Sequence, residues 1–367
     1  MIDNAFWQGK KVFLTGHTGF KGSWLSWWLS LLGAEVTGYA LEPPTSPSLF
    51  QLTKLEKRIT SVIGDLRDYD LLRRSLEAAQ PEAVFHLAAQ PIVRESYLTP
   101  RETYQTNVMG TVNLLEALRT YGKAKAAVMI TSDKCYENRE WLWGYRESDR
   151  LGGYDPYSNS KACAELVTAA YRSSFFNPLD YARHGLGLAT ARAGNVIGGG
   201  DFAVDRLVPD CVRALLKREA VTVRNPRHTR PWQHVLEPLY GYLLLAEKLF
   251  SEAPAFSQAW NFGPEEGEVR EVEAVVKLLC DRWGAPEAYR VESAAGGHEA
   301  GLLKLDSSKA RARLGWKPRW NLETALDKIV EWSRAYQAGE DLSLLCRRQI
   351  EEYAGQGAYY PEPDLPR

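Results

Sequence analysis

Short apolar runs alternate with longer amphipathic stretches through the first half of the chain. Residues 11–15 form a mostly apolar run before a glycine-rich turn, and residues 23–32 are then apolar on nearly every side. A segment of that kind is expected to be covered on both sides. Further strands are predicted by Val- and Ile-rich runs at 35–39, 61–64, 83–87 and 127–131. Helices are predicted between the runs at 71–79 and 103–121, which together indicate a parallel sheet with helices on both faces.

The pattern loosens in the second half of the chain. Glycines cluster at residues 198–200, and Arg and Pro become frequent after residue 186. Helical periodicity then returns at residues 236–250, 269–283 and 322–336. A second and smaller structural unit therefore follows the alternating strands and helices.

Composition narrows the class of protein. The 367 residues carry 45 Lys+Arg against 46 Asp+Glu, a balance that argues against a broadly basic nucleic-acid-binding protein. The longest apolar stretch, residues 24–32, is about half of a membrane span, and the first residues lack a secretory signal. Five scattered cysteines without a C-x-x-C pair favour the cytoplasm. Six histidines without ligand spacing predict no protein-bound metal.

A glycine-rich turn joins the first strand to the first helix. Residues 15–22 read Thr-Gly-His-Thr-Gly-Phe-Lys-Gly, with glycines at G-x-x-G-x-x-G spacing. Glycine permits positive φ and the close approach of a ligand. The helix then directs its free N–H groups and positive dipole end at a pyrophosphate. The residues predicted to bind a dinucleotide here are Gly16, Thr18, Gly19, Phe20, Lys21 and Gly22.

Two other strand ends complete the predicted dinucleotide site. Asp65 and Leu66 follow the third strand, where the Asp65 carboxylate is placed to accept a hydrogen bond from an adenine amino group. Small side chains in the segment Leu87, Ala88 and Ala89 leave room for a flat cofactor after the fourth strand. Only Glu42 is available near the end of the second strand to bind a ribose hydroxyl, and no arginine is placed there for a 2′-phosphate. NAD is favoured over NADP, and that choice stays open.

These features predict an α/β fold. Its core is a Rossmann-type doubly wound parallel sheet, with a smaller C-terminal mixed α/β substrate domain. Residues 1–190 are expected to form the dinucleotide-binding domain, with residues 230–262 returning to it. Residues 191–229 and 263–367 are expected to form the substrate-binding domain.

Two segments carry candidate catalytic groups. Tyr157 and Lys161 lie four residues apart at the start of a predicted helix, so they share one face, about 6 Å apart along the axis. An adjacent ammonium favours the phenolate over the phenol. Ser132, Asp133 and Lys134 end the fifth strand, at the edge where open α/β sheets bind ligands. They offer a hydrogen-bond donor, a proton donor and a base.

Taken together, these residues resemble the extended short-chain dehydrogenase/reductase family of NAD-dependent epimerases and dehydratases. The resemblance includes Asn107, which joins the expected cofactor-binding residues, and it extends to the tail motifs 261–263 and 314–318. Residues 16–24, 89–91, 132–136 and 192–201 most resemble the branch that dehydrates CDP-glucose. Asp133 indicates dehydration, because sugar-nucleotide 4-epimerases lack an acid/base pair there. Lys134 indicates the CDP-sugar branch, because dTDP-glucose dehydratases carry Asp-Glu.

The resemblance implies a hydro-lyase that converts CDP-D-glucose to CDP-4-keto-6-deoxy-D-glucose. C4 is oxidised, water is lost across C5–C6 and hydride returns to C6, with NAD as the internal redox cofactor. Tyr157 is implied to take the C4 hydroxyl proton, with Lys161 lowering its pKa and Ser132 hydrogen-bonding the reacting oxygen. Asp133 is implied to protonate the departing C6 hydroxyl. Lys134 either removes the C5 proton or, if charged, stabilises the enolate.

The family also implies substrate-binding residues. Arg206 and Arg230 match positions that bind the substrate pyrophosphate, where a guanidinium fits phosphate bidentately. Asn195 is expected to donate to a phosphate oxygen, and Gln90 and Arg94 to face the sugar.

Other interpretations stay open. A 4-epimerase, or a dehydratase of another nucleotide sugar, is the second enzyme hypothesis. A non-catalytic dinucleotide-binding sensor is the alternative from another class, although such proteins tend to lose the tyrosine or the lysine. A homodimer or homotetramer is expected through helices 103–121 and 162–175, with neither a nucleic-acid nor a membrane partner. The expected role is deoxysugar supply for surface polysaccharide such as lipopolysaccharide O-antigen.

Overall fold

The computed structural model describes residues 2–223, 225–292 and 301–355. Its centre is a seven-stranded sheet in the order β10-β6-β5-β4-β1-β2-β3, with every neighbouring pair parallel. The strands are β1 Lys11–Thr15, β2 Glu35–Ala40, β3 Thr60–Ile63, β4 Ala83–His86, β5 Ala126–Ile130, β6 Gly187–Ala193 and β10 Ala259–Phe262. The five strands predicted from apolar runs are confirmed, each with ends within one residue of the prediction.

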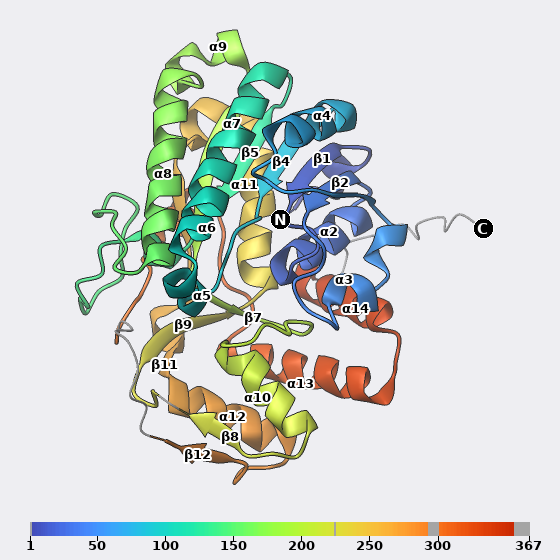
Figure 1. Cartoon of the computed structure of the whole chain (residues 1–367), viewed down its shortest axis with the longest axis vertical. Helices are drawn as coiled ribbons and strands as arrows, with labels where there is room; N and C mark the ends of the chain where they lie inside the picture. Colours follow the sequence, from blue (N-terminus) through green and yellow to red (C-terminus); the bar gives the residue numbers. More distant parts are fainter. Residues whose placement is uncertain (1, 224, 293–300, 356–367) are drawn as a thin grey trace.

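Helices cover both faces of this sheet (Figure 1). One face is covered by α4 Tyr69–Ala79, α7 Gly110–Tyr121 and α8 Pro156–Ser174. The other is covered by α2 Phe20–Leu31, α11 Leu236–Phe256 and α14 Leu342–Ala354. Trp24, Trp27 and Trp28 of α2 are fully buried, in a core that α2 shares with α11 and α14. The doubly wound fold predicted from the sequence is confirmed.

A smaller lobe lies below the sheet in Figure 1. It combines a three-stranded sheet, a two-stranded parallel sheet and three helices around a separate apolar core. These elements are β7 Asn195–Ile197, β9 Thr229–His234, β11 Val269–Glu271, β8 Val221–Val223, β12 Tyr289–Val291, α10 Leu207–Leu216, α12 Val272–Trp283 and α13 Leu322–Ala338. Strand β9 lies in this lobe, whereas α11 and β10, which follow it, pack on the seven-stranded sheet. The lobe is the predicted mixed α/β unit.

Two predicted helices differ from the structure. The helix expected over 103–121 is divided into α6 Pro100–Tyr104, a π-helical turn over Gln105–Met109 and α7. Such turns insert one residue into a helix, often at a functional site, and Asn107 lies within this one. The helix expected over 269–283 begins at Val272, because residues 269–271 pair antiparallel with β9. The last helix, α14, was not predicted.

Short helices complete the chain: α1 Asn4–Trp7, α3 Leu49–Leu52, α5 Val93–Leu98 and α9 Tyr181–His184. Among the described residues, no helix combines the length and apolar character needed to cross a bilayer.

The packing of α14 can be tested by comparing two adjacent leucines. Leu345 is 5% exposed and belongs to the core that α14 shares with α2, whereas Leu344 is 64% exposed. Replacing Leu345 by alanine is expected to lower the free energy of unfolding by about 2–5 kcal/mol. The same change at Leu344 is expected to alter it by less than about 0.5 kcal/mol. Urea unfolding followed by tryptophan fluorescence measures both, and equal losses would contradict this packing.

Candidate active site

The glycine-rich turn between β1 and α2 is closely packed. Gly16 has φ +83°, and a Cβ built there would lie 2.7 Å from the Ala88 backbone nitrogen. A Cβ at Gly22 would lie 2.0 Å from the Gly16 carbonyl oxygen. Gly19 is the N-cap of α2 and provides no side-chain hydrogen bond, so the first N–H groups of the helix are available to an anionic ligand. Only glycine permits this approach, and the turn fits a pyrophosphate.

Lys21 extends from this turn into the site. Its Nζ donates to the Tyr242 hydroxyl of α11 at 3.4 Å. Burial lowers the pKa of Lys21 to about 7, and the positive charges of Lys161 and Arg206 add to that effect. Lys21 therefore lies near Lys161 and Arg206, in the same region of positive charge. Tyr242 was missed by the sequence analysis, because it lies 221 residues further along the chain and belongs to no recognisable motif.

Asp65 and Leu66 follow β3 as predicted, but the Asp65 carboxylate already has a partner. It accepts hydrogen bonds from the Arg67 guanidinium Nε at 2.9 Å and from the Arg67 backbone N–H at 2.8 Å. The side-chain hydrogen bond from Arg67 holds the pKa of Asp65 below its ordinary value. The carbonyl of Leu66 accepts from Asn113 Nδ2 at 2.8 Å. A ligand at this position would meet an ionised carboxylate that already accepts hydrogen bonds from Arg67.

Asn107 braces the loop that follows β4. Its Oδ1 accepts from the Gln90 N–H at 2.8 Å, and its Nδ2 donates to the Gln90 carbonyl at 3.1 Å and to the Ser160 hydroxyl at 2.8 Å. The Gln90 side chain donates to the Thr103 hydroxyl at 2.9 Å. The Ala88 N–H donates to the Thr15 hydroxyl at 3.2 Å. These contacts hold the β4 loop between the glycine-rich turn and α8.

Ser132 and Asp133 lie where β5 ends. The Ser132 hydroxyl donates to Asp133 Oδ1 at 2.9 Å and accepts from the Lys134 N–H at 3.2 Å. Asp133 is 2% exposed, and its Oδ2 has no hydrogen-bond partner among the described residues. Burial raises the pKa of Asp133 above its ordinary value, against the opposing effects of Lys134, Ser132 and Arg230. The site thus contains a carboxyl group that favours its protonated form.

Tyr157 and Lys161 lie in the first turns of α8. Asp155 caps this helix by accepting the Ser158 N–H at 2.9 Å. The Ser132 hydroxyl acts on the Tyr157 phenol and lowers its pKa, so the structure brings together the two segments that the sequence pointed to. Burial has the larger effect and raises the pKa of Tyr157 to about 12. The positive charge of Arg206 also lowers the Tyr157 pKa, but burial outweighs it, so the expected net lowering of the phenol pKa is not found.

Lys161 is buried, whereas Lys134 of the other segment is partly exposed. Its Nζ donates to the Ile130 carbonyl at 3.4 Å. Burial lowers the pKa of Lys161 to about 8, while the negative charge of Glu165 opposes that shift. Glu165 lies four residues further along α8 and so one turn from Lys161.

Two arginines of the small lobe act on this centre. Arg206 precedes α10 and pairs with Asp201 at 3.0 Å. Arg230 in β9 is buried and donates to the Thr229 carbonyl at 3.0 Å. Both act electrostatically on the catalytic segments, Arg206 on Tyr157 and Arg230 on Asp133.

Arg94 and Asn195 differ in exposure. Arg94 is 60% exposed at its side chain and pairs with Asp205 at 2.7 Å. Asn195 is half-buried at the start of β7. In the described parts of the chain, no group of three His, Cys, Asp or Glu side chains is arranged to hold a metal ion.

Comparison with known proteins agrees with this geometry. Residues 13–329 match the family model described as GDP-mannose 4,6 dehydratase. The CDP-glucose 4,6-dehydratase of Salmonella typhimurium is 56% identical over 353 residues, which cover 96% of this chain and 98% of that protein. A dTDP-glucose 4,6-dehydratase of Xanthomonas campestris is 26% identical over 339 residues, covering 87% of this chain and 92% of that protein.

A solved structure shares the fold. It is the dTDP-glucose 4,6-dehydratase of Streptomyces venezuelae with NAD bound, which superposes with a TM-score of 0.74 at 24% identity. The match covers 90% of this chain and 98% of that chain. On the family match and the relative at 56% identity, this chain belongs to the GDP-mannose 4,6-dehydratase family, a group of extended short-chain dehydrogenases/reductases.

Proposed function

We propose that this protein converts CDP-D-glucose to CDP-4-keto-6-deoxy-D-glucose. The observation that carries the proposal is the arrangement around the Ser132 hydroxyl. This hydroxyl donates to the buried Asp133 carboxyl and also acts on the Tyr157 phenol. The chain that holds this arrangement is 56% identical to a CDP-glucose 4,6-dehydratase. We place the reaction in the cytoplasm, as a source of deoxysugars for surface polysaccharide such as lipopolysaccharide O-antigen.

NAD, when bound, supplies the hydride acceptor and donor that this chemistry requires. The packed glycine-rich turn, the uncapped start of α2 and the small side chains after β4 fit a dinucleotide. The residues assigned to hold it are Gly16, Thr18, Gly19, Phe20, Lys21, Gly22, Asp65, Leu66, Leu87, Ala88, Ala89, Asn107, Tyr157 and Lys161. We assign residues 1–190 to the dinucleotide-binding domain, with residues 230–262 returning to it, and residues 191–229 and 263–367 to the substrate-binding domain. The return to the large sheet begins with α11, because β9 pairs within the small lobe, and α14 of the last segment packs on α2.

The protein's own residues handle the protons. Tyr157 takes the proton of the C4 hydroxyl, and Ser132 hydrogen-bonds the same oxygen as negative charge develops there. Asp133 is assigned to protonate the departing C6 hydroxyl, and burial favours the protonated form that this role needs because it raises the Asp133 pKa. Its Oδ2, which has no partner among the described residues, is available for that contact. Lys134 follows in the same turn and is assigned to the C5 proton or to the enolate charge that its removal creates.

The substrate pyrophosphate is assigned to cations of the small lobe. Arg206 and Arg230 flank the catalytic segments, and a guanidinium donates to phosphate through two parallel bonds. Asn195 adds an amide donor, while Gln90 and Arg94 lie on the β4 side of the site. This arrangement leaves the hexose between the phosphate-binding arginines and the Tyr157 hydroxyl.

The alternatives are weaker on specific grounds. A UDP-glucose 4-epimerase of Thermotoga maritima shares the fold with a TM-score of 0.76 at 23% identity, so the fold does not separate epimerase from dehydratase. The buried Asp133 beside Lys134 favours dehydration, because an epimerase has no leaving hydroxyl to protonate. A non-catalytic sensor has no need of Tyr157, Lys161, Ser132 and Asp133 held in one site.

Incubation of the purified protein with CDP-, dTDP-, GDP- and UDP-glucose tests the substrate. Mass spectrometry is expected to show loss of one water from CDP-glucose, at a rate well above that for the other three. Isomerisation at unchanged mass would support the epimerase hypothesis. Equal rates on two nucleotides would overturn the assignment to the CDP-sugar branch, and an inactive protein would support the sensor.

Variants of Asp133 and Tyr157 are expected to block different steps of the reaction, so their roles can be tested separately. Tyr157→Phe is expected to lower turnover by about 10²–10⁴-fold, the usual contribution of a general base. It also abolishes solvent deuterium incorporation at C5, because the 4-ketone no longer forms. Asp133→Asn is expected to lower product formation by a similar factor while C5 incorporation continues.

The controls lie at the start of the short helix α9, at the far end of the large lobe in Figure 1, where Asp180 directly precedes the helix and Tyr181 is its first residue. Tyr181→Phe and Asp180→Asn make the same chemical changes there and are expected to turn over at the wild-type rate. Product formation by Asp133→Asn at that rate would remove Asp133 from the mechanism.

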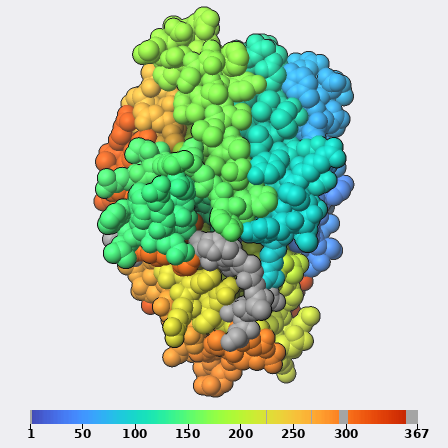
Figure 2. Space-filling view, turned by 60° about the vertical axis from the view of Figure 1, so that its left-hand side comes forward, coloured from blue at the N-terminus to red at the C-terminus, as the bar shows by residue number. Residues whose placement is uncertain are grey.

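We further propose that the protein is a homodimer or homotetramer paired through α7 and α8. Figure 2 shows α8 in green beside the teal helices α6 and α7 along one face of the molecule. That region carries exposed apolar side chains, with Met109 50%, Leu166 57% and Phe175 43% exposed. Apolar surface on adjacent parallel helices is suited to a four-helix interface with a second copy.

Leu166→Glu tests this pairing. A charge buried at the interface is expected to shift the particle mass in light scattering towards that of the monomer. Leu344→Glu places the same charge on exposed α14 and is expected to leave the mass unchanged. A wild-type protein that is already monomeric, or equal masses for both variants and wild type, would contradict the proposal.

A further inference from the structure

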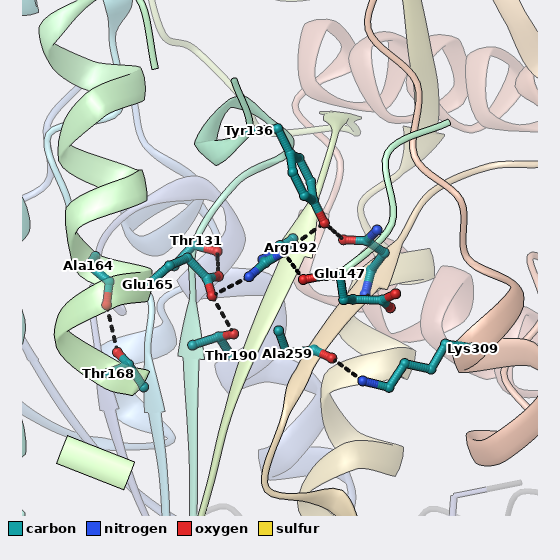
Figure 3. A network of polar contacts seen from close by, with 11 residues as sticks. Thr131, Tyr136, Glu147, Ala164, Glu165, Thr168, Thr190, Arg192, Ala259 and Lys309 are labelled. Atoms are coloured by element: carbon teal, nitrogen blue, oxygen red, sulfur yellow. Dashed lines mark hydrogen bonds and ion pairs between the residues drawn. The ribbon is translucent and has the colours of Figure 1, made fainter. Parts of the chain in front are cut away.

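A buried ion pair joins the catalytic helix to the sheet (Figure 3). Glu165 of α8 and Arg192 of β6 are each 3% exposed at their side chains, and Arg192 Nη2 lies 2.7 Å from Glu165 Oε2. Burial alone would raise the pKa of Glu165, but Arg192 and two hydroxyl donors hold that pKa below its ordinary value. Both partners are therefore charged, and neither belongs to the chemistry assigned above.

Glu165 holds the front of the catalytic segment Ser132–Lys134. Its Oε1 accepts from the Thr131 hydroxyl at 2.5 Å, and its Oε2 accepts from the Thr190 hydroxyl at 2.7 Å. Thr131 is the residue immediately before Ser132. One carboxylate thus links α8 to the end of β5 and to β6.

Arg192 holds the rear of the same segment. Its Nη1 donates to the Tyr136 hydroxyl at 2.7 Å and to the Glu147 carbonyl at 3.3 Å. The Tyr136 hydroxyl donates in turn to Asn261 Oδ1 at 2.7 Å. Tyr136 directly follows the short turn Asp133–Cys135, so both ends of the segment lead to one ion pair.

We propose that the Glu165–Arg192 pair is a positioning element that fixes the Ser132–Lys134 segment relative to Tyr157 and Lys161. The inference rests on the proposed function, because the distance it fixes separates the proton donor from the proton acceptor of that reaction. Glu165 lies on the same helix as Tyr157 and Lys161, while its partners flank Ser132 and Lys134. The pair therefore connects the two halves of the site, in addition to the contact of Lys161 with the Ile130 carbonyl.

Stability alone does not account for this pair. The cost of removing two charges from water largely offsets their attraction, so a buried ion pair adds little net stability over an apolar replacement. Its directional bonds instead specify geometry. Catalysis is sensitive to such geometry, since a displacement of about 1 Å costs about 10²-fold in rate.

Threonine-to-valine variants test the inference with little change in volume. Thr131→Val and Thr190→Val each remove one donor to Glu165, and kcat for CDP-glucose is expected to fall by about 10- to 100-fold, with KM within about twofold. Thr168→Val is the matched control, because the Thr168 hydroxyl is buried on the same helix and donates only to the Ala164 carbonyl at 2.8 Å (Figure 3). Its kcat is expected to equal that of wild type, with a similar fall in Tm.

A second measurement does not depend on turnover. Amide hydrogen exchange at residues 132–136 is expected to be faster in Thr131→Val than in Thr168→Val or wild type. If wild type fails to convert CDP-glucose, the proposed function is wrong, and this exchange still tests the positioning. Unchanged exchange, or faster exchange with kcat equal to that of the Thr168 control, would overturn the inference.

Removing the charge of Glu165 provides a third measurement, the pH dependence of kcat, because Glu165 raises the pKa of Lys161. The groups that face Lys161 electrostatically are Glu165 on its own helix, Cys135 after β5, Lys21 of α2 and His86 of β4. Of these, only Glu165 supplies a permanent negative charge that raises the Lys161 pKa. Glu165→Gln is therefore expected to move the alkaline limb of the kcat–pH profile to lower pH. A limb that stays in place would contradict the electrostatic link between the pair and Lys161.

The double variant Glu165→Gln with Arg192→Met guards against misfolding. Removing both partners avoids leaving one charge buried and unpaired, so the variant is expected to fold. It is expected to keep the kcat loss of Thr131→Val. Full activity in the folded double variant would show that the pair does not position the segment.

Discussion

Exclusion of solvent from the carboxyl edge of the sheet is the constraint on which this site depends. Desolvation disfavours whichever form of a group is charged. It raises the pKa of Asp133 and that of Tyr157, and it lowers the pKa of Lys161 to about 8. One enclosed environment therefore shifts an acid towards its protonated form and an amine towards neutrality. Proton transfer between such groups and a bound sugar needs little charge separation, which suits a reaction that moves several protons over a single hexose.

The parallel sheet makes that enclosure from distant segments. Strands β1, β4, β5 and β6 all end at one edge, so the glycine-rich turn, the β4 loop and the Ser132 turn meet there. The small lobe closes the same edge. Trp24 of α2 donates its indole N–H to the Gly199 carbonyl at 3.0 Å, which ties the cofactor-side helix to the glycine cluster after β7. Packing between the lobes thus limits where a ligand can lie.

The sequence predicts the parts of this architecture that depend on near neighbours. Strands buried on both faces appear as continuous apolar runs, and the shared face of Tyr157 and Lys161 follows from helical spacing alone. Contacts between remote residues carry no such signal. The Lys21–Tyr242 contact and the Glu165–Arg192 pair depend on which strands become neighbours.

Residues of both lobes surround the Asp133 carboxyl and affect its pKa. A Cβ at Gly194 would lie 3.1 Å from Asp133 Oδ2 and 2.8 Å from the Pro231 ring, so the free carboxyl oxygen lies where β6 gives way to the small lobe. Arg230, also from that lobe, lowers the pKa of the same carboxyl, while burial beneath the large sheet raises it. The pKa of the Asp133 carboxyl therefore depends on residues of the small lobe as well as on its own turn.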